Sequence, residues 1–288
     1  MSAVLVNQLT YLLGTVRANF RALLWRTVLP IRTGIPEWAE NVQQYKIVNN
    51  AAEPVPHQIG NQKAPTPSFD RSKGSLPLLE FALGMNIWDA ELARKEQTGI
   101  DVSEESSLAN SRSCEEFLDK IAALGDTRYG LPGLVNSADV TTLTINGDWA
   151  NQDQESVLLD ASNIIFQVFS QSKNLLTAKV LLVPDDTYAT LGSRYNTLGT
   201  ATFLELIQKA NPGVTIKPWY KLRTAGAGGT RRVVAFDNAQ DVAAMLMVHE
   251  FRNGEALRVH GGYEVLQTVK TGGVMIKQAQ GICYADGV

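Results

Sequence analysis

The sequence predicts an α+β fold. Amphipathic helical patterns and apolar extended runs follow one another in mixed order, rather than in the regular alternation typical of a parallel α/β sheet. The chain has 288 residues, of which 44% are hydrophobic and 19% charged. It is therefore long enough to bury a large core in one or two domains.

Net charge and cysteine content exclude several classes of protein. A formal net charge of −3 is too small to indicate a surface that coats nucleic acid. Cys114 and Cys283 are far apart, and neither lies in a C-x-x-C pattern, so there is no zinc or redox signature. We expect two reduced thiols within the fold.

Residues 1–35 are predicted to form an N-terminal arm. Their apolar stretch contains Arg17, Arg21 and Arg26, and its longest uncharged part is too short to span a bilayer. The arginines fall on one side of a helix and the apolar residues mostly on another. A helix lying on a membrane surface is one interpretation. We favour an arm that docks on the rest of the protein or on a neighbouring copy, without a membrane partner.

A projecting loop is predicted next. Residues 42–48 (VQQYKIV) alternate like a strand, and residues 76–88 (LPLLEFALGMNIW) are apolar and extended. The segment between them, 49–75, is largely polar and is interrupted by prolines and glycines. Connections this long in compact domains are usually functional or disordered. We predict a hairpin loop on two strands, and a passive surface loop is the alternative.

Two helices should follow the loop. The first, residues 89–99, is short and closed by a glycine. The second has Ser103 as its N-cap, carries an apolar face at i, i+3, i+4, i+7 spacing, and runs to Leu124 before Gly125.

The second half of the chain mixes both types of element. We expect strands at 140–145 and 178–184, helices at 153–171 and 200–210, a helix start at 185, and extended segments at 214–220, 231–237 and 242–250. The glycine-rich stretch 225–232 lacks the Lys-Ser/Thr pair of a phosphate-binding loop and precedes a strand. It is predicted to be a hairpin tip.

No stretch carries a recognisable catalytic or metal-binding signature. His57, His249 and His260 form neither H-E-x-x-H nor H-x-H, so we predict structural or surface roles for them. Helix capping explains Asp185 and Asp186, and no serine lies in a G-x-S-x-G turn. We therefore predict no catalytic residue, no metal and no cofactor, although an enzyme with a dispersed site stays open as an alternative.

One region is similar to a known family. A short E-L-x-x-A-like helix is followed by a long helix that ends in a G-D-x-x-x-G-x-x-G-L-x-N turn. The matching positions are Glu91, Leu92, Gly125, Asp126, Gly130, Gly133, Leu134 and Asn136. This order resembles the major capsid proteins of tailed bacteriophages, in particular the DUF2184 capsid family with the HK97 fold. Residues 272–279 resemble the family's ending, with Ala279 where proline is common.

The resemblance implies an HK97-like capsid fold in four parts. These are an N-terminal arm (1–35), an extended loop on two strands (36–90), a peripheral domain built on a long spine helix (91–145 and 246–288), and an axial domain (146–245). It also implies a function without catalysis, because a shell protein works by contacts between copies.

The implied function is that of a major capsid protein in the virion. Copies would self-assemble in the host cytoplasm, as pentamers and hexamers, into an icosahedral shell around double-stranded phage DNA held by non-specific contact. A separate scaffold, a portal and decoration proteins would be further partners. An encapsulin-like nanocompartment shell is the nearest alternative. Some capsids of this fold join a loop lysine to a neighbour's asparagine, but we predict no such cross-link from Lys63 or Lys73.

The predicted inter-subunit contact lies in the loop. Residues 50–74 contain four prolines and few core-type residues, so they cannot order themselves by burial alone. We expect this segment to be mobile in the free subunit and ordered against a neighbour. Phe69 is the predicted apolar anchor, with Arg71 and Lys73 meeting carboxylates across the contact.

Overall fold

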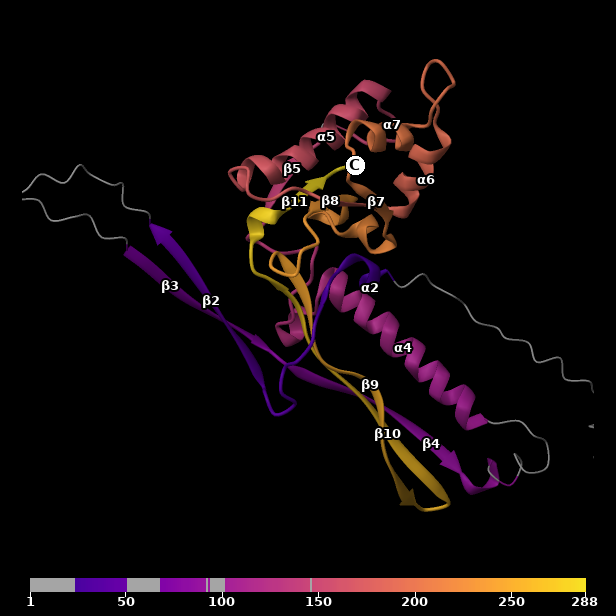
Figure 1. Cartoon of the computed structure of the whole chain (residues 1–288). Coiled ribbons are helices and arrows are strands. Elements are labelled where there is room, and N and C mark those ends of the chain that lie inside the picture. Colours follow the sequence, from indigo (N-terminus) through magenta and orange to yellow (C-terminus); the bar gives the residue numbers. More distant parts are fainter. Residues whose placement is uncertain (1–23, 51–67, 92, 94–101, 146) are drawn as a thin grey trace, which may run out of the picture.

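The computed structural model describes residues 24–50, 68–91, 93, 102–145 and 147–288 (Figure 1). These residues form two lobes and one projecting ribbon. The upper lobe in Figure 1 holds a five-stranded sheet with its helices and the C-terminus. The lower lobe is elongated and places a long helix beside a four-stranded sheet. The mixture of helices and sheets confirms the predicted α+β class.

The upper lobe is built on a sheet with the strand order β5–β11–β8–β6–β7. Its strands are β5 (Thr141–Thr144), β6 (Val180–Val183), β7 (Thr215–Pro218), β8 (Arg232–Phe236) and β11 (Ile282–Asp286). Its helices are α5 (Gln154–Gln171), α6 (Asp185–Ser193) and α7 (Phe203–Ala210). Every residue of β6 and β8 is buried, because alternate side chains enter two different cores, one on each face of the sheet.

The glycine-rich stretch 225–232 is not a hairpin tip. It belongs to the connection from β7 to β8, and β6 lies between these two strands in the sheet, so β7 and β8 are not paired as a hairpin. The connection contains two 3-10 turns, η2 (Tyr220–Thr224) and η3 (Ala227–Gly229), of which η3 lies in the glycine-rich stretch. A glycine-rich turn next to a strand does not reveal which strand lies beside it, which is why the prediction was wrong.

The lower lobe contains a sheet with the order β1–β9–β10–β4. Its strands are β1 (Ile31–Arg32), β4 (Leu79–Trp88), β9 (Ala243–Val259) and β10 (Gly262–Ile276). The long helix α4 (Val102–Leu124) lies along this sheet and is the predicted spine helix (Figure 1). It begins one residue before the predicted N-cap, Ser103, and ends where predicted. Of the predicted helix 89–99, residues 89–91 and 93 are helical, and the rest lies outside the described residues.

The ribbon pairs β2 (Asn41–Asn50) with β3 (Ser68–Pro77) in antiparallel register and leaves the body between the lobes (Figure 1). This corrects the predicted pairing. The partner of β2 is a strand from the polar segment, whereas the apolar run 79–88 forms β4 and pairs with β10. The sequence of β3 is largely polar and lacks the apolar alternation that predicts a strand. Residues 51–67 lie outside the described part of the chain.

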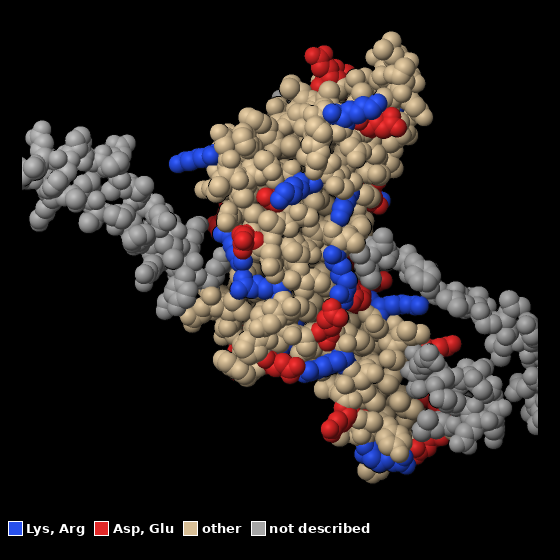
Figure 2. Space-filling view, in the orientation of Figure 1, with Lys and Arg blue, Asp and Glu red and all other residues tan. Residues whose placement is uncertain are grey.

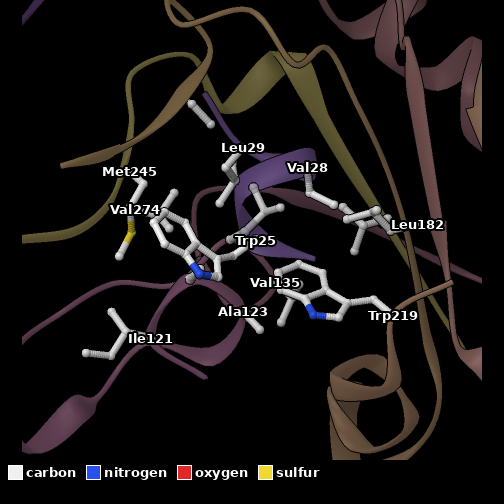
Figure 3. Close-up of a cluster of buried hydrophobic side chains, with 14 of the residues drawn as sticks. Trp25, Val28, Leu29, Ile121, Ala123, Val135, Leu182, Trp219, Met245 and Val274 are labelled. Carbon is white, nitrogen blue, oxygen red and sulfur yellow. The ribbon is translucent and has the colours of Figure 1, made fainter. Parts of the chain in front are cut away.

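The end of the predicted arm is built into the body. Residues 1–23 lie outside the described residues, but α2 (Trp25–Val28) and β1 follow them directly. Trp25, Val28 and Leu29 are at most 2% exposed and pack among residues from α4, β6, β9 and β10 (Figure 3). β1 pairs with β9 in parallel, with Ile31 opposite Met245. Trp25, Val28 and Leu29 therefore anchor this segment in the core.

The predicted division into four parts stays a prediction, but the pairing of two strands is relevant to its boundaries. β5 and β11 fall within the ranges assigned to the peripheral domain, and both pair in the upper sheet, with Cys283 opposite Thr141. No helix among the described residues is long and apolar enough to cross a membrane.

Candidate assembly surfaces

The turn after α4 folds back onto the helix and satisfies its last carbonyl groups. Helices leave these acceptors without partners unless a cap supplies donors. Here the donors come from the segment that contains the predicted G-x-x-G-L-x-N motif. The bonds run from Leu134 N to Ala122 O (2.9 Å), from Val135 N to Ala123 O (3.0 Å), and from the Asn136 side-chain amide to Leu124 O. The motif is thus a C-terminal cap made by a distant part of the turn.

Two glycines allow this close return. Gly125 has φ +69°, and a Cβ there would lie 2.3 Å from the carbonyl oxygen of Leu131. A Cβ on Gly133 would lie 2.4 Å from the carbonyl oxygen of Ala123. Such distances are far below van der Waals contact, so both positions need glycine.

Asp126 organises the same turn. Its Oδ1 accepts hydrogen bonds from the backbone N–H (3.1 Å) and Nε–H (3.0 Å) of Arg128, and its Oδ2 accepts one from Nη2 (2.6 Å). The Arg128 side-chain hydrogen bonds are the main reason why the pKa of Asp126 is lowered to about 2. This carboxylate fixes the start of η1 (Thr127–Tyr129).

A buried arginine joins this turn to the upper lobe. Arg232 on β8 donates from Nε and Nη2 to the two carboxylate oxygens of Asp286 at 2.6 and 2.7 Å, and from Nη1 to Val135 O. Its guanidinium lies 4.7 Å from the ring centroid of Tyr284, whose hydroxyl donates to Leu134 O. These contacts hold the turn in one shape against the upper lobe.

The base of the ribbon is fixed to the lower sheet. Leu78, between β3 and β4, packs with Leu246 and Met275 in a small buried cluster. Arg252 makes two hydrogen bonds to the carboxylate of Glu37, at 2.7 and 3.1 Å, and Lys270 Nζ donates to the Glu37 carbonyl oxygen at 2.7 Å. The pairing with Arg252 lowers the pKa of Glu37. The segment that leads into β2 is therefore tied to β9 and β10.

The predicted contact residues Phe69, Arg71 and Lys73 occupy alternate positions of β3. Their backbone partners on β2 are Asn49, Ile47 and Tyr45. Placement on a ribbon strand was not anticipated, since all three were assigned to a loop. Their role in contacts between copies stays a prediction.

The other polar residues singled out from the sequence have structural partners. Asp185 accepts two hydrogen bonds from Arg223 (2.6 and 2.7 Å), which lower its pKa, and Asp186 pairs with Arg231 (2.8 Å). Both aspartates lie in the first turn of α6, whose N-cap residue is Pro184, and Asp186 Oδ1 accepts a hydrogen bond from the backbone N–H of Thr187 (2.9 Å). His249 Nε2 is 3.4 Å from Glu80, and His57 lies outside the described residues. Within the described ranges, no three His, Cys, Asp or Glu residues are grouped so that they could hold a metal ion.

Exposed apolar side chains were missed by sequence reasoning, because hydrophobicity alone does not tell a core residue from a surface one. The most exposed are Trp38 (84%), Leu198 (83%), Leu175 (76%), Tyr195 (64%), Leu257 (63%) and Phe166 (62%). They lie on both lobes. Single exposed apolar residues are ordinary, whereas a contiguous apolar patch marks a contact with another protein.

Comparison with solved structures identifies the fold. The capsid of Myoviridae phage XM1 is similar with a TM-score of 0.84 at 16% identity, covering 100% of this chain and 99% of that one. A chain of Mycobacterium phage Adephagia gives 0.67 at 10% identity, covering 99% and 97%. A virus-like particle from Pyrococcus furiosus gives 0.58 at 15% identity, covering 92% of each chain. A search of curated sequences found no match.

These likenesses and the architecture show an HK97-like capsid fold, as predicted. The sequence model of the major capsid protein family matches residues 59–288, and the chain belongs to that family. Its members and structural neighbours are structural proteins, which fits a protein without catalytic activity. The narrower DUF2184 grouping stays a prediction.

Proposed function

We propose that this major capsid protein self-assembles into a closed icosahedral shell of pentamers and hexamers around double-stranded phage DNA. The observation that carries the proposal is the β2–β3 ribbon. A two-stranded ribbon is only marginally stable in water when nothing covers it, and this one projects away from both lobes (Figure 1). A neighbouring copy would supply the surface that it needs.

The encapsulin-like alternative is less favoured. The virus-like particle from Pyrococcus furiosus is similar with a TM-score of 0.58, against 0.84 for the phage XM1 capsid. A shell that encloses DNA also has to avoid strong repulsion of phosphate. The face shown in Figure 2 carries acidic and basic side chains interspersed, without a large field of either sign, which fits weak, non-specific DNA contact.

Further partners follow from the same proposal. Assembly would take place in the host cytoplasm, with a separate scaffold, a portal at one vertex and decoration proteins on the finished shell.

Particle size is the first test. The purified protein should give closed particles of megadalton mass by negative-stain microscopy and light scattering. Particles recovered from the producing host should also protect double-stranded DNA from nuclease. A uniform dimer or tetramer at every salt and protein concentration would contradict the proposal.

A further inference from the structure

The loop between α6 and α7 holds two apolar side chains away from the body. Tyr195 is 64% exposed and Leu198 is 83% exposed. The turn beneath them is fixed by Asn196, whose backbone N–H donates to Ala201 O (2.9 Å) and whose Oδ1 accepts from Thr200 N–H (2.8 Å). We call Tyr195 and Leu198 the knob. Because its backbone is already ordered, the knob loses little conformational entropy when it is buried.

A hollow of about 390 Å³ opens at another place on the same lobe. Its apolar lining consists of Ile165, Phe166, Phe169, Ala178, Ala210, Pro212 and Val214. Asn211, also in the lining, donates from Nδ2 to Ser162 Oγ (3.3 Å) and to Ile207 O (3.1 Å). Its amide N–H groups are therefore already bonded, and an apolar side chain could enter without leaving them unpaired.

One copy cannot fill its own hollow. The knob precedes α7, whereas the hollow lies beyond the other end of that helix, at Asn211 and Pro212. α7 has eight residues, which corresponds to a length of about 12 Å. In Figure 1, the loop rises on the right of the upper lobe and α5 lies on the left.

We propose that the knob of one copy inserts into the hollow of the next copy, as a head-to-tail contact between upper lobes. This inference rests on the proposed shell function and names the surfaces that join neighbouring copies. A contact between two different surfaces of identical chains is heterologous, and it closes into a ring when the rotation between copies is suitable. The knob and the lining of the hollow contain no charged side chain, so none of their residues brings a charge that has to be desolvated.

Disulfide trapping tests the contact. A variant with Leu198→Cys and Phe166→Cys carries one cysteine on each side, and its shells are oxidised after assembly. The native thiols should stay inert, because Cys114 and Cys283 are buried and burial raises their pKa values to about 11 and about 12. We expect a ladder of linked multimers on a non-reducing denaturing gel. The absence of a ladder from such shells would overturn the inference.

Matched variants establish the direction of the contact. Leu198→Cys alone and Phe166→Cys alone should stay monomeric on the gel, and shells assembled from both variants together should give dimers that contain one chain of each. Combining Leu198→Cys with Leu257→Cys, an exposed leucine on the lower lobe, should give no ladder. Dimers from Leu198→Cys alone would show that two loops meet each other, which contradicts a head-to-tail contact.

A second measurement needs no substitution. Hydroxyl-radical footprinting of wild-type shells and of unassembled subunits should show Leu198 and Phe166 both protected at least several-fold on assembly. It decides the question even if the cysteine variants fail to assemble. Protection of only one of the two residues would overturn the contact but leave the shell function intact. Absence of shells from the wild-type chain under all conditions would overturn the proposed function and this contact together.

Discussion

Gly125 and Gly130 share a left-handed backbone but differ in their surroundings. Their φ values are +69° and +68°. A Cβ on Gly130 would find its nearest neighbour 4.0 Å away, at Pro77, whereas one on Gly125 would meet backbone atoms at 2.3 to 2.8 Å. Gly130→Ala should therefore cost about 1–2 kcal/mol from backbone conformation alone. Gly125→Ala should cost a further ~1–3 kcal/mol, because the turn has to move off the helix.

Urea unfolding of the unassembled subunit, followed by circular dichroism, measures both changes. Gly130→Ala is the matched control, because it measures the cost of the left-handed backbone conformation alone. Equal losses of unfolding free energy in the two variants would show that close packing against the helix end is unimportant.

Asp126 makes a pH-dependent contribution to the free energy of unfolding, and the direction of its pKa shift gives the sign of that contribution. Its pKa of about 2 is below the reference value of 3.8, so the folded state favours the ionised form. This contribution is fully present above the unfolded pKa and is lost as the pH falls from about 4 towards 2. Asp126→Asn should therefore be less stable than wild type at pH 6, with a smaller difference at pH 3. Denaturant titrations at both pH values test this, and a constant difference would contradict it.

The sequence predicted which residues matter at this turn, but not all of their partners. The glycines, Asp126 and Asn136 stand out because they match the turn motif of the capsid family that the sequence resembles. Arg232 and Tyr284 complete the same site, yet they bond to residues 97 and 150 positions away in the sequence. Only the folded chain brings such residues together.

At the scale of elements, the N-terminal segment contains two tryptophans that differ in burial. Trp25 on α2 is fully buried and donates from Nε1 to Glu115 (3.0 Å), whereas Trp38 is 84% exposed. Trp25→Ala should lower the free energy of unfolding by about 3–5 kcal/mol, because it leaves a cavity in the core. Trp38→Ala should stay within about 0.5 kcal/mol of wild type. Thermal or urea unfolding of unassembled subunits compares them, and similar losses would refute the burial argument.

The ribbon can be removed without opening the small cluster at its base. Replacing residues 43–75 with a short Gly/Ser linker keeps Val42, Leu76 and Leu78, which pack with Leu246 and Met275. The body should keep its helical circular dichroism signal and its unfolding temperature, since the helices lie in the two lobes and not in the ribbon. Stable shells should be lost. Shells of normal yield and thermal stability from this variant would show that the ribbon is a passive surface feature.

Helices were easier to predict than strand pairing. The end of α4 and the span of α5 follow from periodicity and from capping residues, which are local signals. α7 begins at Phe203 instead of 200, because Thr202 and Glu205 form a capping box there. The pairing of β2 with β3, of β1 with β9 and of β11 with β5 depends on segments far apart in sequence, so no local pattern identifies it.

At the scale of the whole shell, we expect the subunits to stay covalently separate. A lysine–asparagine cross-link needs a desolvated carboxylate near the lysine. Within the described residues, Asp119 is a buried carboxylate whose pKa is raised by burial, but it accepts a hydrogen bond from Trp219 Nε1 (3.2 Å) inside the core. It is therefore closed to Lys63 or Lys73 of another copy. Denaturing gels of mature particles should show one band near 31.4 kDa, and reduction-resistant multimers would contradict this expectation.

The parallel pairing of β1 with β9 also constrains when the subunit can be completed during synthesis. Ile31 leaves the ribosome early, but Met245, its partner in the sheet, is made more than two hundred residues later. The core around Trp25 likewise requires Trp219 and Val274. In a nascent chain, the segment around Trp25 and Ile31 therefore lacks its native partners until nearly all of the protein has emerged. Such non-local contacts also form slowly. Because the completed core appears only at the end of translation, unfinished chains lack the folded body on which assembly depends.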